Sequence, residues 1–163
     1  MTKIISPAFI SLQKAENICQ FAFQGAQLDS FEVRSIEMVM TFMNSDSAGK
    51  LLQFRVSSLS DISCKKEFDG DFHLKRKLLL PKLYGLLGEY VSRVWLDDYR
   101  RLNISFGGDD LLIFSGESGV DYDPLDYSWH VDFDDDLGMV PKVLSLSCVI
   151  SNSREVEFYE RVE

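Results

Sequence analysis

The sequence predicts an α+β fold in which antiparallel β-sheet dominates and one or two short helices accompany it. Along most of the 163 residues apolar and polar side chains alternate, which is typical of strands with one buried face. Helical spacing of apolar residues is confined to a stretch near the N-terminus and a leucine-rich stretch in the middle. A hydrophobic content of 45% is sufficient for one core, so we expect residues 1–163 to form a single domain.

The first expected element is a helix over residues 7–21. Ser6 and Pro7 supply a capping residue followed by a proline at the first helical position. The apolar residues that fall on one helical face after them are Phe9, Leu12, Ala15, Cys19 and Ala22. This helix should therefore bury one stripe and expose the rest.

From Phe31 onward, alternation replaces the helical period and predicts a strand followed by a hairpin. The residues at 44–49 have the composition of a turn and divide two alternating runs. The apolar residues of these runs are Met38, Met40, Phe42, Leu52, Phe54 and Val56. A further strand is expected around Ile62, Cys64 and Phe68.

A second helix is expected only over residues 80–87. Residues 74–87 are basic at their start and rich in leucine afterwards, but Pro81 interrupts them. A proline inside a helix removes one backbone hydrogen bond and clashes with the preceding turn. We therefore expect the helix to start near Pro81 rather than to cross it.

Alternating runs return after this helix. They lie at residues 90–96 and 102–106, and the glycine-containing turn 107–110 joins the second run to an apolar strand at 111–114. The remaining expected strands lie at residues 127–133, 142–150 and 155–162.

The order of elements predicts an internal repeat, with one copy in residues 7–68 and the other in residues 80–133. Setting Gly25 against Gly88 makes each copy a helix that leads into a small antiparallel meander. This alignment pairs Leu28, Phe31, Val33, Met38, Met40 and Phe42 with Val91, Val94, Leu96, Leu102, Ile104 and Phe106. Because any meander alternates in this way, a chance match is the alternative.

The net charge of −9 is concentrated in one quarter of the chain. Residues 97–136 contain twelve carboxylates and two arginines, a balance of −10. The remaining residues hold fourteen acids and fifteen bases, a balance of +1. A negative field of this density attracts cationic partners and repels nucleic acid, so direct binding of DNA or RNA is not expected.

We expect the turns and loops of this acidic quarter to bind a partner. Aromatic rings among carboxylates have the composition of an interaction hot spot, because rings give contact area while acids pair with Lys or Arg. The predicted partner-binding residues are Asp109, Asp110, Asp121, Tyr122, Asp123, Asp126, Tyr127, Asp134, Asp135 and Asp136. Tyr122 is expected to be the most exposed ring, whereas Trp95 and Trp129 are expected in the core. The alternative is a surface that serves solubility alone.

The sequence contains no catalytic motif, so we do not expect an enzyme. Cys19, Cys64 and Cys148 are odd in number and far apart, which predicts buried thiols instead of disulfides or a zinc site. His73 and His130 lie in no catalytic motif. A nucleophile close to either histidine would favour the alternative, a small enzyme or ligand carrier.

Spacing also argues against a calcium loop and a nucleotide site, so no cofactor is expected. The acidic run that starts at Asp121 has Asp126 where a calcium loop needs glycine and Asp132 where it needs glutamate. Gly107 and Gly108 lack the lysine and the following helix of a phosphate-binding loop. A metal-binding regulatory module that uses the acidic loops is a further alternative, which calorimetry with calcium would test.

Residues 86–114 and 127–131 resemble small bacterial immunity proteins that are encoded beside polymorphic and contact-dependent inhibition toxins. The shared pattern is Leu-x-Gly at 86–88, a strand, Leu-x-Ile-x-Phe at 102–106, a Gly/Asp turn, an apolar strand and Ser-Trp at 128–129. The resemblance implies a β-rich bacterial protein that binds one cognate toxin domain, often a basic nuclease, and blocks its active site. It carries over no residue roles, because immunity proteins diverge most where they touch the toxin.

A cytoplasmic location is expected. No run of eighteen apolar residues occurs, and the N-terminal residues lack the charged, apolar and small-residue succession of a signal peptide. The sequence therefore predicts a binding protein without a membrane segment, which neutralises a cognate basic toxin domain. It leaves the oligomeric state open.

Overall fold

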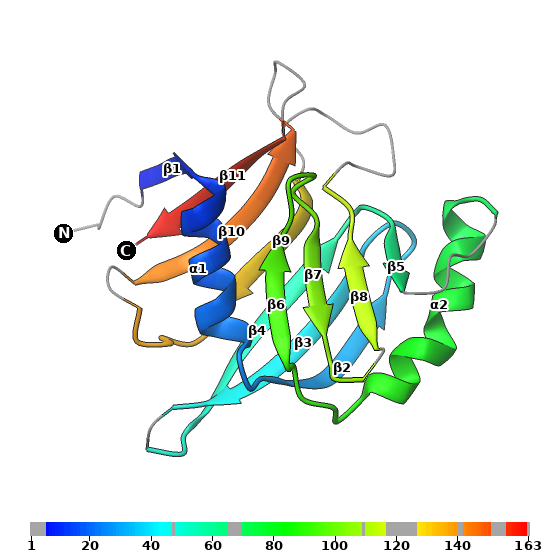
Figure 1. The fold of residues 1–163 in the computed structure, drawn as a ribbon, viewed down its shortest axis with the longest axis horizontal. Helices are drawn as coiled ribbons and strands as arrows, with labels where there is room; N and C mark the ends of the chain where they lie inside the picture. The colour runs from blue at the N-terminus through cyan, green and yellow to red at the C-terminus, as the bar shows by residue number, and fades with distance from the viewer. Residues whose placement is uncertain are drawn as a thin grey trace.

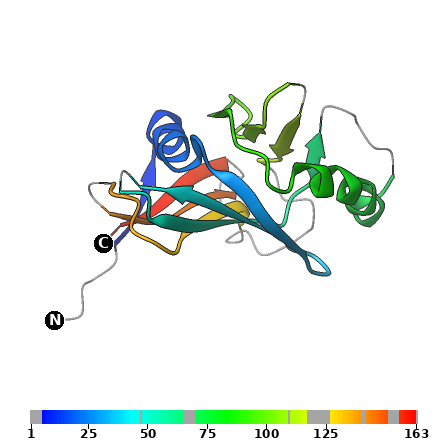
Figure 2. The same cartoon turned by 90° about the horizontal axis from the view of Figure 1, so that it is seen from below.

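The computed structural model describes residues 6–46, 48–64, 70–108, 110–116, 127–139, 142–150 and 156–162. In these ranges the chain forms a seven-stranded sheet, a four-stranded sheet and two helices, and every strand pair is antiparallel. The predicted β-rich α+β fold is confirmed. The two helices flank the smaller sheet, and all three lie on one face of the larger sheet (Figures 1 and 2).

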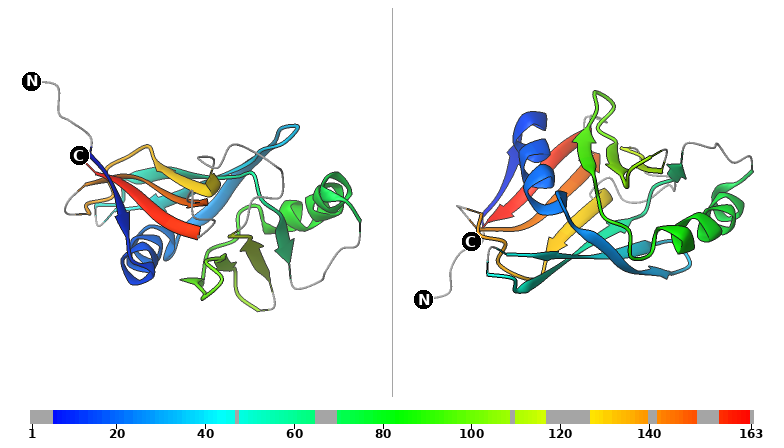
Figure 3. Two further views of the ribbon diagram at one scale, coloured as in Figure 1. Left: turned by 90° about the horizontal axis from the view of Figure 1, so that it is seen from above. Right: turned by 60° about the horizontal axis from the view of Figure 1, so that its bottom comes forward.

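The elements follow one another in a simple order along the chain. They are β1 (Ser6–Ile10), α1 (Leu12–Phe23), β2 (Gln27–Val33), β3 (Met38–Ser45), β4 (Leu51–Ser58), β5 (Ile62–Cys64), α2 (Phe72–Leu86), β6 (Arg93–Leu96), β7 (Leu102–Ser105), β8 (Leu111–Phe114), β9 (Tyr127–Phe133), β10 (Val143–Ile150) and β11 (Val156–Val162). The larger sheet has the order β1-β11-β10-β9-β4-β3-β2, and the smaller has the order β5-β8-β7-β6. In the first sheet, β1 and β11 lie at the opposite end of the molecule from α2 (Figures 1 and 3).

The predicted start of the first helix is wrong. Residues 6–10 form the edge strand β1, which pairs with β11, and the helix starts at Leu12. Ser11 is the N-cap, because its Oγ accepts a hydrogen bond from the Lys14 N–H at 3.2 Å. A proline is tolerated in an edge strand, so Pro7 fits β1 as well as a first helical turn.

The second helix is longer than predicted and crosses Pro81. Asp71 caps it, since its Oδ1 accepts a hydrogen bond from the Leu74 N–H at 2.9 Å. Leu79, Leu83 and Leu86 are buried on one face of the helix. Burying three leucines stabilises the helix by several kcal/mol, on the order of 2 kcal/mol each, which exceeds the roughly 3 kcal/mol that an internal proline costs.

The predicted hairpin around residues 44–49 is confirmed, with β3 and β4 paired from Met38 and Ser58 at one end to Ser45 and Leu51 at the other. The run at 102–114 also folds as predicted, as the β7–β8 hairpin. In the expected strand near Phe68, residues 62–64 form β5, and residues 65–69 lie outside the described residues. The three expected C-terminal strands are β9, β10 and β11.

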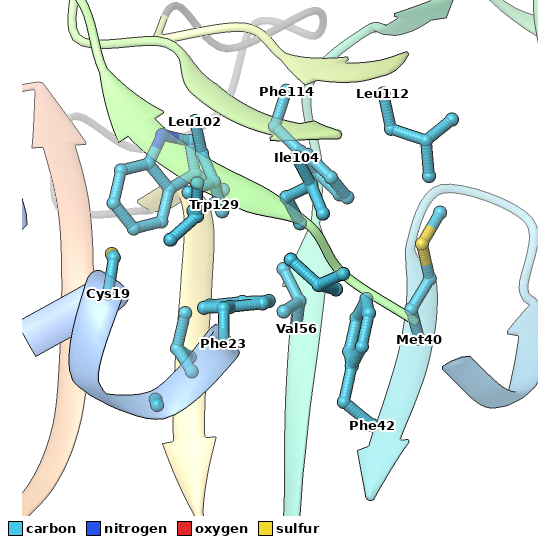
Figure 4. Packing of buried hydrophobic residues seen from close by; sticks show 14 of the residues in the cluster. Cys19, Phe23, Met40, Phe42, Val56, Leu102, Ile104, Leu112, Phe114 and Trp129 are labelled. Atoms are coloured by element: carbon cyan, nitrogen blue, oxygen red, sulfur yellow. The ribbon is translucent and has the colours of Figure 1, made fainter. Parts of the chain in front are cut away.

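The hydrophobic core lies between the larger sheet and the layer above it, and it contains residues of both halves of the chain (Figure 4). Phe23 of α1 meets the rings of Phe42 and Phe54 edge-on, at centroid distances of 5.1 and 4.8 Å. Trp129 is buried as predicted, and its Nε1–H donates to a backbone carbonyl at 3.2 Å. Trp95 is only partly buried, because it lies on the outer face of the smaller sheet under the Arg93 guanidinium.

The two stretches that follow the helices pair with each other. The Gly25 N–H donates to the Val91 carbonyl at 3.3 Å, and the Gly88 N–H donates to the Leu28 carbonyl at 2.8 Å. The predicted repeat sets Gly25 against Gly88 and Leu28 against Val91, so each of these bonds is the counterpart of the other. Both glycines have positive φ, which turns the chain sharply out of each helix.

The halves also exchange strands. After the meander β2–β3–β4 the chain crosses to the smaller sheet, where β5 pairs with β8. After the meander β6–β7–β8 it crosses back, and β9 pairs with β4. The two crossings are joined alike, since the Leu59 N–H donates to the Ser128 carbonyl and the Ser115 N–H donates to the Asp61 carbonyl, at 3.1 and 3.0 Å. The two crossings therefore tie the smaller sheet to the larger sheet at two places; the internal repeat and the single domain stay predictions.

Candidate functional site

The structure describes five of the ten predicted partner-binding residues. These are Asp110, Tyr127, Asp134, Asp135 and Asp136. The others, Asp109, Asp121, Tyr122, Asp123 and Asp126, lie outside the described residues. The predicted binding surface can therefore be compared with the structure at the turn before β8 and at the two ends of β9.

Asp110 lies in the β7–β8 turn and faces α2. Its carboxylate forms an ion pair with the Lys82 ammonium. Residues 134–136 lie on a different element, in the loop that follows β9 beside β4. The structure thus distributes these acidic residues over two sheets, and two of them, Asp110 and Asp134, form ion pairs with Lys82 and Arg55 of the same chain.

The three aspartates after β9 are held mainly by β4. Asp134 forms an ion pair with Arg55 at 2.9 Å, and Asp135 accepts a hydrogen bond from the Gln53 N–H at 2.9 Å. Asp136 accepts a hydrogen bond from the Gly138 N–H two residues later, at 2.8 Å. These contacts fix the loop, so its carboxylates are presented from a defined backbone.

Tyr127 is bonded within the protein. Its hydroxyl donates to Glu37 Oε1 at 2.8 Å, and its ring stacks on His130 at a centroid distance of 4.9 Å. Burial and the hydrogen bond to Glu37 raise the pKa of this phenol well above its ordinary value. Tyr127 therefore stabilises the join between β9 and the β2–β3 turn, a role that the sequence did not predict.

A hollow of about 670 Å³ opens beside Asp136. Three segments that are distant in sequence form its walls: the end of α1, the β3–β4 hairpin and the loop after β9. The residues that line it are Phe21, Gln24, Asn44, Ser45, Asp46, Leu52, Asp136, Leu137 and Gly138. We take this hollow as the candidate functional site, because it combines acidic, polar and apolar side chains in one concave surface.

Asn44 lines the hollow and connects it to the end of α1. Its Nδ2 donates to the carbonyls of Ala22 and Gln24, at 3.0 and 3.2 Å, so it caps the C-terminus of α1. The carbonyl end of a helix carries a partial negative charge, and the last turn of α1 contains no basic residue to offset it. The hollow therefore contains a negative helix end in addition to its carboxylates.

Two carboxylates give the hollow its charge, Asp46 and Asp136. Asp46 Oδ1 accepts hydrogen bonds from two N–H groups of the β3–β4 turn, at 2.8 and 2.9 Å, which fixes the carboxylate in place. None of the described residues that line the hollow is a lysine or an arginine. Phe21, Leu52 and Leu137 provide apolar wall, and Phe21 is exposed. Such a surface suits a cation with an apolar stem.

The sequence predicts Asp136 as a site residue but not the rest of the hollow. Phe21 lies in the expected helix, to which no function is assigned, and Asp46 lies in an expected turn outside the acidic quarter. A signal exists in retrospect, since an acidic turn at 44–49 and an acidic run at 134–136 flank strands that both belong to the larger sheet. Their meeting depends on the pairing of β4 with β9, which joins residues about 75 positions apart in sequence, as in the Val56–Val131 pair.

His130 does lie close to a hydroxyl. Its Nδ1 is 2.5 Å from Ser147 Oγ, and its Nε2 is 2.9 Å from Asp132 Oδ1. Nucleophilic catalysis requires an accessible hydroxyl and an orienting carboxylate that is shielded from water. Ser147 is only 6% exposed in the middle of β10, whereas 47% of the Asp132 side chain is exposed. The hydroxyl is thus buried and the carboxylate is exposed, which is the opposite of the arrangement in a serine hydrolase. The three side chains instead form a polar contact between strands.

The other sequence expectations concern cysteines, metals and membranes. Cys19, Cys64 and Cys148 are buried and form no disulfide, and burial raises the pKa of the Cys148 thiol to about 12. Among the described residues no group of three or more His, Cys, Asp or Glu side chains is placed to hold a metal ion. No helix in the described part of the chain is long and apolar enough to cross a membrane.

No protein family, curated protein or solved structure matches this chain. The resemblance of residues 86–114 to immunity proteins therefore stays a prediction. Any function has to be argued from the geometry of the hollow and from the surfaces around it.

Proposed function

We propose that this chain is an inhibitor-type binding protein, which neutralises a basic protein partner by receiving one of its cationic side chains in the hollow. The observation that carries the proposal is the convergence of Asp46, Asp136 and the C-terminal end of α1 on one concave surface. The expected partner is a cognate toxin domain, and a basic nuclease fits best. Its phosphate-binding lysines and arginines are the groups that a negative hollow would attract.

The physical chemistry of the contact follows from the lining. A lysine or arginine that enters the hollow packs its methylene stem against Phe21, Leu52 and Leu137 and brings its charge to Asp46 and Asp136. A hydrogen-bonded contact of this kind contributes about 1.5–3 kcal/mol. Because the carboxylates are already held by backbone N–H groups, little conformational entropy is lost when the cation binds.

The second candidate function is the binding of a small cationic ligand. A volume of about 670 Å³ lies within the usual range of ligand pockets, roughly 300–1,000 Å³. Such a ligand would bind through the same two carboxylates, but it would not require a protein partner. Titration of the purified chain with a polyamine separates the two functions, since only the ligand carrier should bind it with micromolar affinity.

The test uses the protein that the adjacent reading frame encodes, or a basic protein that co-purifies with this chain. We expect Asp46→Asn combined with Asp136→Asn to weaken binding at least tenfold, because two charge-assisted contacts are lost. Asn preserves the side-chain oxygens that hold the turns, so the fold should persist. Asp29→Asn, an exposed carboxylate on β2, is the matched control and should leave the affinity unchanged.

Salt gives a second readout, because a contact between charges weakens as ionic strength rises. The affinity of the unmodified chain should fall between 50 and 500 mM salt, and the double variant should respond less. If the double variant binds as tightly as the control, or if the partner that is recovered is acidic, the proposed function is wrong.

A further inference from the structure

Helix α2 is apolar on two opposite faces. One face packs on the body of the protein through Leu79, Leu83 and Leu86, all of which are buried. On the other face Leu74 is 46% exposed and Leu78 is 42% exposed. A helix at the surface of a monomeric protein normally turns a polar face to water, so an outward leucine pair indicates a second packing surface.

Exposed apolar side chains are concentrated in this region. Among the described residues, five exposed large apolar side chains lie within residues 74–90: Leu74, Leu78, Tyr84, Leu87 and Tyr90. The same number is scattered over all other described residues, namely Phe9, Phe21, Val33, Leu51 and Tyr99. Helix α2 also forms one end of the molecule, away from α1, whose end lines the hollow (Figures 1 and 3). The region is therefore accessible to a macromolecule.

The spacing on the outward face is that of a helix that packs against another helix. Leu74, Leu78, Pro81 and Gly85 follow one another at intervals of four, three and four residues, and all four are exposed. This is the spacing of the seam between two packed helices. The small residues Pro81 and Gly85 would let a second backbone approach closely at one end of the seam, while the two leucines supply the contact area at the other.

The charge of α2 determines which helix it can accept. Residues 72–86 contain four lysines and arginines and no acid. Lys77 is exposed on one side of the seam, and Lys75 and Lys82 lie on the other, where they pair with Asp61 and Asp110 but stay partly exposed. Pairing of α2 with a second copy of itself would bring lysines against lysines, and a net charge of −9 opposes adsorption to an anionic membrane.

We propose that the outward face of α2 is a docking site for an acidic amphipathic helix of a partner protein. Leucine-type residues of that helix pack against Leu74 and Leu78. Its carboxylates pair with Lys77 on one side and share Lys75 and Lys82 with Asp61 and Asp110 on the other. The site is separate from the hollow, so the chain can hold two partners, or two parts of one partner, at the same time.

The probe is a synthetic helical peptide of four heptads with leucine at the seam positions and glutamate on both sides of it. Fluorescence anisotropy with the full chain should show saturable binding at micromolar peptide concentration. Leu78→Glu should weaken binding at least tenfold, because a charge then replaces the leucine that packs against the peptide. Lys77→Glu should weaken it about threefold or more, since a like charge then faces the peptide.

Three controls make the outcome decisive. Leu51→Glu, at a leucine that is 65% exposed on the β3–β4 hairpin, should leave peptide binding unchanged. Asp46→Asn combined with Asp136→Asn should also leave it unchanged, which separates this site from the proposed function. A peptide with lysine in place of glutamate should not bind.

Several results would overturn the proposal. These are no binding of the acidic peptide up to 1 mM, equal binding of the lysine peptide, or full binding by the Leu78→Glu chain. Self-association of the unmodified chain that Leu78→Glu abolishes would assign the face to a second copy instead. Binding of phosphatidylserine vesicles without binding of the peptide would assign it to a lipid surface.

Discussion

Asn44 connects the stability of the fold with the charge of the hollow, and its replacement has a calculable effect. Asn44→Ala removes the two hydrogen bonds that Nδ2 donates to the carbonyls of Ala22 and Gln24, which are 3.0 and 3.2 Å long. It also removes the exposed bond that Oδ1 accepts from the Ser45 N–H at 2.8 Å, but water can solvate that N–H, so the two Nδ2 bonds dominate the loss. A partly exposed hydrogen bond contributes about 0.5–1 kcal/mol, so we expect the free energy of unfolding to fall by about 1–2 kcal/mol. With a urea m-value of about 2 kcal/mol/M, the unfolding midpoint should fall by about 0.5–1 M.

Asn44→Asp is the sharper variant because it preserves the shape of the side chain. It replaces the donor by a carboxylate, which then faces the negative end of α1 and lies in the same hollow as Asp46 and Asp136. We expect a further loss of about 0.5–1 kcal/mol relative to Asn44→Ala at pH 7. The folded protein should raise the pKa of the introduced carboxyl, so this extra loss should be absent below about pH 4 and should develop as the pH rises.

Urea unfolding at pH 3.5 and pH 7, followed by circular dichroism, measures both variants. An unfolding midpoint of Asn44→Ala within 0.2 M of the unmodified chain would mean that the cap contributes nothing to stability. Equal stability of the two variants at pH 7 would mean that the hollow lacks the negative charge assigned to it.

Two further predictions concern α2 and β9. Pro81→Ala should stabilise the protein by about 1–2 kcal/mol, because the restored N–H completes a helical hydrogen bond. Calorimetry should show a melting temperature about 4 °C higher, and no increase would mean that α2 is already broken at this residue. For Tyr127, the folded state raises the phenol pKa above its ordinary value of 10.0. Its contribution to stability is therefore complete below about pH 10 and is lost as the pH rises further. Tyr127→Phe should flatten this alkaline loss in urea titrations between pH 9 and 11, and an unchanged pH profile would contradict the assignment.

The sequence predicts the elements whose signals are local. The alternation on both sides of residues 44–49 and the turn residues between them are local signals of a hairpin, so the sequence predicts the β3–β4 hairpin. The sequence predicts the wrong start for α1 because Ser6 and Pro7 carry the local signal of a helix start. The pairing of β1 with β11, far away in sequence, instead holds residues 6–10 as a strand. The predicted helix start near Pro81 is wrong for a similar reason. The buried leucines that stabilise α2 on both sides of the proline are visible only in the tertiary structure.

The candidate site shows the same limit. The charge map identified residues 134–136 as part of an acidic quarter, but it treated that quarter as one face. Arg55 and Lys82, which neutralise Asp134 and Asp110, come from outside the quarter, and no composition count shows that they reach it. The hollow itself depends on the end of α1 and on the β3–β4 hairpin, so its prediction would have required the strand pairing.

The exchange of strands between the halves has a consequence for how the protein is made. On the ribosome, β4 is complete at Ser58, but the strand that covers its free edge starts only at Tyr127. The partner of the edge strand β1 is synthesised later still, because Ser6 pairs with Val162 of β11. Sheet edges that are paired in the folded protein therefore stay open until β9 and β11 have been synthesised, and open edges of this kind favour aggregation.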